Sequence, residues 1–326
     1  MPDSPVLREA AEALRKAERV SLACHINPDG DALGSMLGLA LALESLGKSV
    51  VCLCQDPVPH SYRFLPTSER VVKEPPKDWR PDVAVGLDCD AEHRLGSVAP
   101  YILNAPCVID IDHHTGSGPF GDIRVLDPGA SSTSQEVFDL LPHLGVAFSR
   151  DLAICLLAGI IFDTGAFRFS NTSPRTFEAG AQLVAAGAEP DIIHQNMFDD
   201  RPLSNLKLLG RALTTAQMED GIAWSALTRQ DFKETNAEET ETEGIITNLM
   251  AIRGVRAAAL FRETAHGVKV SLRSRNGIDV AEIARHFGGG GHKKASGCTV
   301  EKPIPEAMKE VLSLMKQASQ EKPAES

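Results

Sequence analysis

The stretch RVSLACHINPDGD, from Arg19 to Asp31, decides the fold and the chemistry expected of this chain. Its first half, Arg19 to Cys24, is an apolar run that predicts a buried strand, and HINPDGD follows at once. The second half offers one imidazole and two carboxylates, the ligands that Mn²⁺ and Mg²⁺ accept: His25, Asp29 and Asp31. No thiolate is among them, so a structural zinc site is disfavoured. On this motif alone, an ordinary turn that caps the following helix explains residues 29–31 equally well.

Three further apolar runs end in carboxylate or imidazole side chains. The run Val83–Leu87 stops at Asp88, the run Cys107–Ile111 leads into DHH at 112–114, and LAICLLAGIIFD ends at Asp163. In an open parallel sheet, ligand sites collect outside the carboxyl ends of the strands. We therefore expect these side chains to converge with those of the first motif at one edge of a sheet.

These four segments resemble the four motifs of the DHH phosphoesterase superfamily, with the triplet at Asp112, His113 and His114. The resemblance extends over about residues 15–170. A second stretch, FGGGGHKKASG from Phe287 to Gly297, is similar to the glycine-rich motif of the DHH-associated C-terminal domain. Together the two regions resemble the nanoRNase group, whose members degrade short oligoribonucleotides and remove the 3′-phosphate of pAp.

Length and periodicity predict two α/β domains. A chain of 326 residues with 43% apolar side chains is about twice a typical domain length and can form two cores. Strand and helix signals alternate through the first half, which argues for a doubly wound sheet. We expect an N-terminal doubly wound parallel-sheet domain over 1–200, a linker over 201–212, and a smaller α/β domain over 213–326. The strands expected in the first domain are 19–24, 49–54, 82–88, 106–111 and 123–126, and 211–218 is expected to be strand-like in the second.

Composition excludes several classes of protein. The net charge of −11 argues against a protein that coats long nucleic acid. No run of about 18 uncharged apolar residues appears, so we expect no membrane span, and the first residues lack the basic start of a signal peptide. The seven cysteines form no C-x-x-C pair and mostly sit in apolar runs, which predicts buried free thiols of a cytoplasmic protein.

The resemblance implies six metal ligands: His25, Asp29, Asp31, Asp88, His113 and Asp163. Their four carboxylates carry a formal charge of −4, which neutralises two divalent ions, and Mn²⁺ is the expected metal. By the family pattern, His25 and Asp29 hold one ion, Asp31 and His113 hold the other, and Asp88 bridges both. Asp163 completes the site. Two-metal hydrolases use such ions to activate water and to stabilise the oxygens of a displacement at phosphorus.

His114 and Asp112 are expected to act without binding a metal. The resemblance suggests that His114 faces the scissile phosphate and donates a hydrogen bond or protonates the leaving oxygen. Asp112 is expected to orient a histidine. A purely structural role for His114 stays an alternative. Asp90 and Asp110 are not expected to be ligands, because strand alternation and the motif pattern disfavour them.

A basic region accompanies the glycine motif. Between Arg253 and Lys294 there are nine Lys or Arg against three acids, a local excess of six. Glycine lets backbone N–H groups approach an anion closely, and arginine can clamp a phosphate or stack on a base. Alone, the glycine run would be a flexible hairpin or a helix stop. With its flanking residues we expect a substrate-binding set: Arg273, Arg275, Gly289, Gly290, Gly291 and His292.

The sequence thus predicts a two-domain, Mn²⁺-dependent phosphoesterase that holds its metals in the first domain and grips substrate with the second. Short single-stranded RNA, cleaved to mononucleotides, and pAp, converted to AMP, are the expected substrates, and a homodimer stays open. The enzymatic alternatives are a linear or cyclic dinucleotide phosphodiesterase and a RecJ-type single-strand exonuclease. A non-catalytic nucleotide sensor on the same fold is disfavoured, because a binder has no need to assemble four carboxylates. An assay of phosphate or nucleotide release with Mn²⁺ would separate the enzyme from the sensor.

Overall fold

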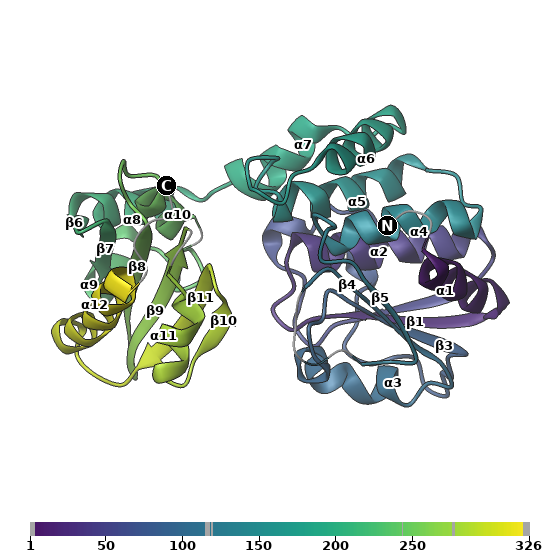
Figure 1. Cartoon of the computed structure of the whole chain (residues 1–326), viewed down its shortest axis with the longest axis horizontal. Helices are drawn as coiled ribbons and strands as arrows, with labels where there is room; N and C mark the ends of the chain where they lie inside the picture. Colours follow the sequence, from purple (N-terminus) through teal and green to yellow (C-terminus); the bar gives the residue numbers. More distant parts are fainter. Residues whose placement is uncertain (1–3, 115–117, 119, 243, 276–277, 322–326) are drawn as a thin grey trace. The chain divides into compact units, whose positions relative to one another are not determined.

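The computed structural model describes residues 4–114, 118, 120–242, 244–275 and 278–321. The chain forms two compact units, Met1–Asp200 and Arg201–Ser326, and each is described by itself (Figure 1).

The first unit is built on a five-stranded sheet in which every pair of neighbours is parallel, in the order β2-β1-β3-β4-β5. The predicted doubly wound parallel sheet is confirmed, and each strand lies within two residues of its expected bounds. All carboxyl ends therefore meet at one edge of the sheet. The strands are β1 (Arg19–Cys24), β2 (Ser49–Leu53), β3 (Val83–Leu87), β4 (Val108–Asp112) and β5 (Ile123–Leu126).

Helices cover both faces of this sheet. Figure 1 shows α2 (Gly30–Ser45), α4 (Thr133–Leu144) and α5 (Arg150–Asp163) on one face, with α3 (Ala99–Leu103) on the other. A separate apolar cluster lies under each layer. The remaining helical segments are α1 (Pro5–Lys16), η1 (His60–Tyr62), η2 (Ser68–Arg70), η3 (Glu92–Val98), α6 (Pro174–Ala185), α7 (Pro190–His194) and η4 (Gln195–Asp199).

Two helices of the larger layer pack at unusually short range. A Cβ atom placed on Gly34 of α2 would lie 2.5 Å from the carbonyl oxygen of Cys155 in α5, so only glycine allows this approach. This approach holds α5 against α2, and α5 ends at Asp163. Asp163 thus reaches the site from the end of a helix, unlike Asp88, His113 and His114, which follow strands.

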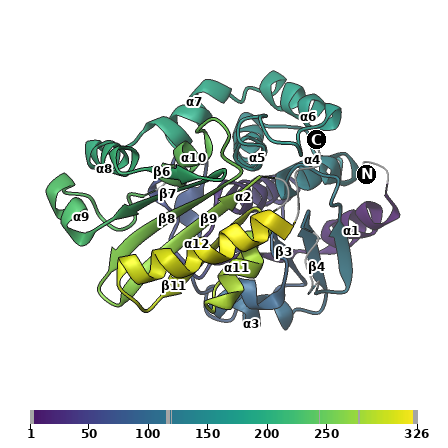
Figure 2. The same ribbon diagram turned by 60° about the vertical axis from the view of Figure 1, so that its left-hand side comes forward.

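The second unit contains a mixed six-stranded sheet in the order β10-β11-β9-β8-β7-β6. One face packs against α11 (Val280–His286) and α12 (Ile304–Glu321). Helix α12, drawn in yellow in Figure 2, crosses the strands. The other face packs against α8 (Leu203–Thr214), α9 (Arg229–Thr235) and α10 (Ile245–Met250). The strands are β6 (Gln217–Glu219), β7 (Ile222–Leu227), β8 (Ala257–Thr264), β9 (Gly267–Ser274), β10 (Gly290–His292) and β11 (Ala295–Val300).

The structure differs from the expectation at the entry to this unit. Most of 201–212, expected as a linker, is helix α8, and the strand expected over 211–218 is reduced to β6. Leu208 and Ala212 are fully buried in the second core. They lie four residues apart on one helical face, so the apolar spacing belongs to a packed helix and not to a connection.

The structure also describes the environment of the cysteines and the length and polarity of the helices. All seven cysteines are free and six of them are buried, as predicted, while Cys107 is half-buried. Among the residues that the structure describes, no helix is both long enough and apolar enough to cross a membrane.

Candidate metal centre

The loop after β1 both caps a helix and presents ligands. The carboxylate of Asp29 is the N-cap of α2, and its Oδ1 accepts hydrogen bonds from the N–H groups of Asp31 and Ala32, at 3.0 and 3.1 Å. Its Oδ2 lies 3.5 Å from Nε2 of His25. The two interpretations of this motif are therefore compatible, because one oxygen of Asp29 serves the helix and the other faces the imidazole.

Asp88 occupies the middle of the cluster. It directly follows β3, has a left-handed φ of 59°, and its side chain is only 3% exposed. Its Oδ2 lies 3.5 Å from Nε2 of His25, and its Oδ1 lies 3.7 Å from Nε2 of His113. A non-glycine residue with positive φ is uncommon and often marks a constrained site. The carboxylate faces a histidine on either side, which is the position that a bridging ligand requires.

The remaining expected ligands gather on the far side of Asp88. Nε2 of His113 lies 2.9 Å from Oδ2 of Asp163 and 4.0 Å from Oδ2 of Asp31, which is fully buried. Potential ligand atoms fall into three groups, each within 4.8 Å: His25, Asp29 and Asp88; Asp31, His113 and Asp163; and Asp88, His113 and His114. All six side chains singled out in the sequence thus converge.

His114 lies closer to the cluster than expected. Its Nδ1 is 3.6 Å from Oδ1 of Asp88, within reach of a shared ion. The same Nδ1 is 2.7 Å from Oδ1 of Asp112, which also accepts from the backbone N–H of His114 at 3.2 Å. Asp112 therefore fixes the orientation of the His114 ring.

The first turn of α4 holds two of the carboxylates, and the sequence analysis missed it. The N–H groups of Thr133 and Ser134 donate to Oδ2 and Oδ1 of Asp31, at 2.7 and 2.8 Å. The hydroxyl of Thr133 donates to Oδ1 of Asp88 at 3.0 Å. The start of a helix carries a partial positive charge and unpaired N–H donors, so it stabilises buried carboxylates. The run SSTS at 131–134, which spans the start of this helix, was the available signal.

The buried charges shift several pKa values in the metal-free centre. For His25, burial by itself would lower the pKa, but hydrogen bonds and charge interactions with Asp29 and Asp88 outweigh it and raise the pKa to about 11. For His113, burial acts in the same direction and is outweighed by Asp163, so its pKa is also raised to about 11. The carboxylates therefore keep both imidazoles protonated when no metal is bound.

Asp31 and Asp88 shift in opposite directions. Burial raises the pKa of Asp31, and the charges of Asp88 and Asp163 raise it further. Burial would also raise the pKa of Asp88, but its contacts with His25 and the charge of His113 lower it below its usual range. Without a metal, bound protons therefore offset much of the carboxylate charge in the centre, and a cation would take over that role.

The donor set fits divalent metal ions. Nε2 of His113 is buried, and although Asp163 is close, its N–H makes no well-aligned hydrogen bond within the described part of the chain. A buried ring nitrogen surrounded by carboxylates is the arrangement that a metal ligand adopts. Imidazole and carboxylate groups together suit hard to borderline ions. These clusters of acidic and histidine side chains could therefore bind metal.

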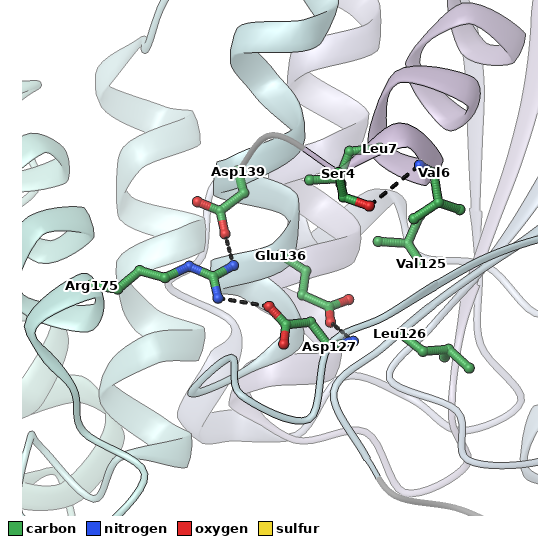
Figure 3. A pocket seen from close by; sticks show the side chains of 9 residues that line it. All are labelled: Ser4, Val6, Leu7, Val125, Leu126, Asp127, Glu136, Asp139 and Arg175. Atoms are coloured by element: carbon green, nitrogen blue, oxygen red, sulfur yellow. Dashed lines mark hydrogen bonds and ion pairs between the residues drawn. The ribbon is translucent and has the colours of Figure 1, made fainter. Parts of the chain in front are cut away.

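A separate cavity of about 110 Å³ lies between α1, β5, α4 and α6 (Figure 3). The guanidinium of Arg175 bonds to Oδ2 of Asp127, at 2.7 Å, and to Asp139. Oε1 of the buried Glu136 accepts from the N–H of Asp127 at 2.6 Å. None of the expected site residues lines this cavity, and its charged groups tie α6 to α4.

The glycine run of the second unit has a structural explanation. α11 ends at His286, Gly288 has a φ of 72°, and β10 and β11 then pair as a hairpin. A Cβ on Gly289 would lie 2.2 Å from the carbonyl oxygen of Gly297, and one on Gly291 would lie 2.6 Å from that of Ala295. The helix stop and hairpin considered in the sequence analysis are thus both present. Ligand binding by Gly289, Gly290 and Gly291 stays a prediction.

The expected arginines lie near this hairpin in sequence and in the sheet. Arg273 is on β9, in register with Ala295 of β11. Burial lowers the pKa of Arg273, and the charge of Arg262 on β8, which the sequence analysis did not single out, lowers it further. Arg275 donates to the carbonyl of Met250 at 2.9 Å. The side chain of His292 and residues 276–277 lie outside the described residues.

The two regions each match a known protein family. Residues 19–160 match the model of the DHH family, N-terminal domain, and residues 221–321 match that of the DHHA1 domain. The chain is 35% identical over 298 residues to the bifunctional oligoribonuclease and PAP phosphatase NrnA of Thermus thermophilus, covering 90% of this chain and 88% of that protein. The protein of the same description from Bacillus subtilis is 28% identical over 85% of this chain and 87% of its own length.

A solved structure extends the similarity to the whole fold. The crystal structure of an exopolyphosphatase-related protein from Bacteroides fragilis superimposes with a TM-score of 0.91 at 26% identity. The match covers 97% of this chain and 96% of that one. Both sheets and the helices around them are therefore shared along nearly the full length.

Proposed function

We propose that this chain, which belongs to the DHH family and within it to the bifunctional oligoribonucleases and PAP phosphatases, hydrolyses short oligoribonucleotides to mononucleotides and converts pAp to AMP. The observation that carries this proposal is the convergence of four carboxylates and two imidazoles around Asp88. The similarity to an enzyme of this description along 90% of the chain supports the choice of substrates.

We assign two divalent ions, with Mn²⁺ as the expected metal, to the two outer groups of the cluster. His25, Asp29 and Asp88 would hold one ion, while Asp31, His113 and Asp163 would hold the other. Asp88 contacts both histidines and would be shared. When bound, such a pair of ions activates water and stabilises charge on the phosphoryl oxygens. The four carboxylates balance the charge of two such ions.

His114 and Asp112 are assigned to proton transfer. Asp112 holds Nδ1 of His114 at 2.7 Å, so a proton passed to a leaving oxygen would come from Nε2. Burial would lower the pKa of His114, but Asp112 and the charge of Asp88 raise it. A raised pKa favours the protonated imidazole, which is the form that a general acid requires. Asp112 would also stabilise the protonated ring.

Arg273 of β9 is assigned to binding a phosphate or a base of the substrate. Its guanidinium is partly buried beside that of Arg262, and an anion would relieve the repulsion between the two. Arginine offers paired N–H donors that match phosphate oxygens. The hairpin with Gly289, Gly290 and Gly291 is assigned to the same ligand.

The test is a substrate panel with the purified full chain and Mn²⁺. Release of phosphate from pAp, and of mononucleotides from labelled di- to pentanucleotides, is the expected result. An Asp88→Asn variant keeps the size of the side chain but removes its charge, and it should lose activity on every substrate by more than tenfold. Asp191→Asn, at an exposed position in α7, is the matched control and should keep activity.

Two of the alternatives give a different outcome once cyclic dinucleotides are added to the panel. Turnover of linear or cyclic dinucleotides without turnover of pAp or longer RNA would favour a dinucleotide phosphodiesterase. Nucleotide binding without any product release would favour a sensor and contradict the proposal.

A further inference from the structure

Phe169 is a large aromatic side chain that stays exposed beside the candidate metal centre. It is 53% exposed, and it follows α5, whose last residue is Asp163. Its backbone N–H donates to the carbonyl of Thr164 at 2.9 Å. A Cβ placed on Gly165 would lie 2.4 Å from Cζ of the ring. The chain therefore folds back so that the tip of the ring covers the backbone two residues beyond Asp163.

The segment that carries this ring is held in an uncommon conformation. Gly165, Ala166 and Phe167 have successive φ values of 55°, 58° and 62°. Alanine and phenylalanine rarely adopt left-handed φ, and such residues persist only where the surroundings impose the conformation, often at functional sites. Asn171 anchors the chain on the far side of this segment, because its Nδ2 donates to the carbonyls of Ser131 and Asp163, at 2.9 and 3.1 Å.

The two aromatic residues of the segment have different environments. The ring of Phe167 is stacked on that of Phe177, with centroids 5.3 Å apart and planes at 16°, and it packs against the main core. Phe169 is left at the surface. Arg168 lies between them, and its Nε donates to the carbonyl of Gly165 at 2.7 Å. An exposed ring and a guanidinium thus share one turn next to a predicted ligand.

We propose that Phe169 is the stacking surface for the nucleobase of the nucleotide whose phosphate is hydrolysed. This inference rests on the proposed function and adds a base-binding site in the first unit. The metal centre is built from charged groups, which suit the phosphate but offer nothing to an apolar base. Stacking on an aromatic ring is available to every base and therefore tolerates any sequence, as a nuclease for short RNA requires. Arg168 contributes positive charge to the same site.

The experiment compares two substrates that differ only in the base. pAp and ribose 3′,5′-bisphosphate carry the same phosphates, so the ratio of their kcat/KM values measures what the base contributes. In Phe169→Ala this ratio should fall about five- to hundredfold, the loss expected when one base loses its stacking partner, and mainly through KM for pAp. Phe169→Trp should preserve the ratio. Phe169→Leu, apolar but not aromatic, should lose most of it.

A control variant and a binding measurement complete the design. Tyr101→Ala removes another exposed aromatic ring, on α3 before the start of β4, and should leave the ratio unchanged. Binding of the 2-aminopurine analogue of pAp, with Ca²⁺ in place of Mn²⁺, reports stacking through quenching of its fluorescence. Quenching should be strong in the wild-type protein and weak in Phe169→Ala.

The outcomes distinguish this inference from the function on which it rests. If the wild-type protein hydrolyses pAp and Phe169→Ala leaves the ratio unchanged, or lowers both kcat/KM values equally, the base does not stack on Phe169. If the wild-type protein turns over neither substrate, the proposed function fails. The quenching comparison still decides whether this ring binds a base.

Discussion

Replacing Gly159 with alanine should damage the metal centre without altering any ligand. Gly159 lies in α5, and a Cβ atom there would lie 1.9 Å from Oγ of Ser134 and 2.6 Å from Oδ1 of Asp31. Non-bonded carbon contacts are about 3.5–4.0 Å, so one of these groups must move. A new rotamer of Ser134 is not enough, because its Cβ would also lie 2.7 Å from the added atom. The shift therefore reaches the contacts of Asp31 with the N–H groups of Thr133 and Ser134, at 2.7 and 2.8 Å.

The expected change in the free energy of unfolding combines one stabilising effect and two destabilising ones. Alanine is favoured over glycine within a helix by about 1 kcal/mol. Overpacking a core costs about 1–3 kcal/mol, and a hydrogen bond to a charged group contributes about 1.5–3 kcal/mol. Together these effects should lower the free energy of unfolding of Gly159→Ala by roughly 1.5–5 kcal/mol. The affinity for Mn²⁺ should fall by roughly 10–100-fold, as for residues that orient metal ligands.

Calorimetric titration with Mn²⁺ and urea unfolding of the metal-free protein measure these two quantities separately. The matched control is Gly180→Ala in α6, where the new Cβ would lie 3.4 Å from Phe167, an ordinary contact. This control should keep its Mn²⁺ affinity and gain up to about 1 kcal/mol of stability. If Gly159→Ala binds Mn²⁺ as tightly as the wild-type protein, the contact between α5 and Asp31 does not shape the centre.

Three further predictions concern the ligands and the second unit. His113→Ala should lower metal content because it removes a ligand, whereas His114→Ala should keep both metals and lose turnover. Plasma mass spectrometry measures the metal content, and equal metal loss in the two variants would mean that both residues are ligands. His25 and His113 have pKa values of about 11 without metal, so each should release about one proton when Mn²⁺ binds near neutral pH. The affinity for Mn²⁺ should therefore rise with pH, and titration in weakly buffered solution with an indicator measures the released protons. A pH-independent affinity would contradict this prediction. Arg273→Ala should reduce kcat/KM for pAp and short RNA by roughly 1.5–3 kcal/mol. Hydrolysis of bis-p-nitrophenyl phosphate should then change little, and comparable losses on both would mean that Arg273 supports the fold.

The sequence predicted the sheet of the first unit and the convergence of six side chains because both follow from general rules. Parallel strands separated by helices place their carboxyl ends at one edge, so acids that end strands must meet there. The position of Asp163 could not be predicted in this way, because Asp163 ends a helix and its place depends on the close approach of α5 to α2 at Gly34. Local patterns along the chain do not contain that contact.

Other features could not be predicted because they depend on contacts between distant residues. The N–H donors of Thr133 and Ser134 reach Asp31 across more than a hundred residues of sequence. The run SSTS at 131–134 marks the start of a helix, but it does not say which carboxylate the backbone N–H groups of that helix bind. The range 201–212 was assigned to a linker on its place in the chain, although Leu208 and Ala212 have the spacing of a buried helical face.

The main-chain bonds to Asp31 have a consequence for which substitutions the centre can tolerate. A backbone N–H is common to nineteen of the twenty amino acids, so changes of side chain at residues 133 and 134 leave the grip on this carboxylate in place. Size is restricted instead, because Ser134 faces Gly159. Residue 134 should therefore be small, but its side chain need not be polar. Only proline would remove the backbone N–H that donates to Asp31. Among distant relatives the side chain at position 134 should therefore vary, although the backbone N–H at that position keeps the same hydrogen bond to Asp31.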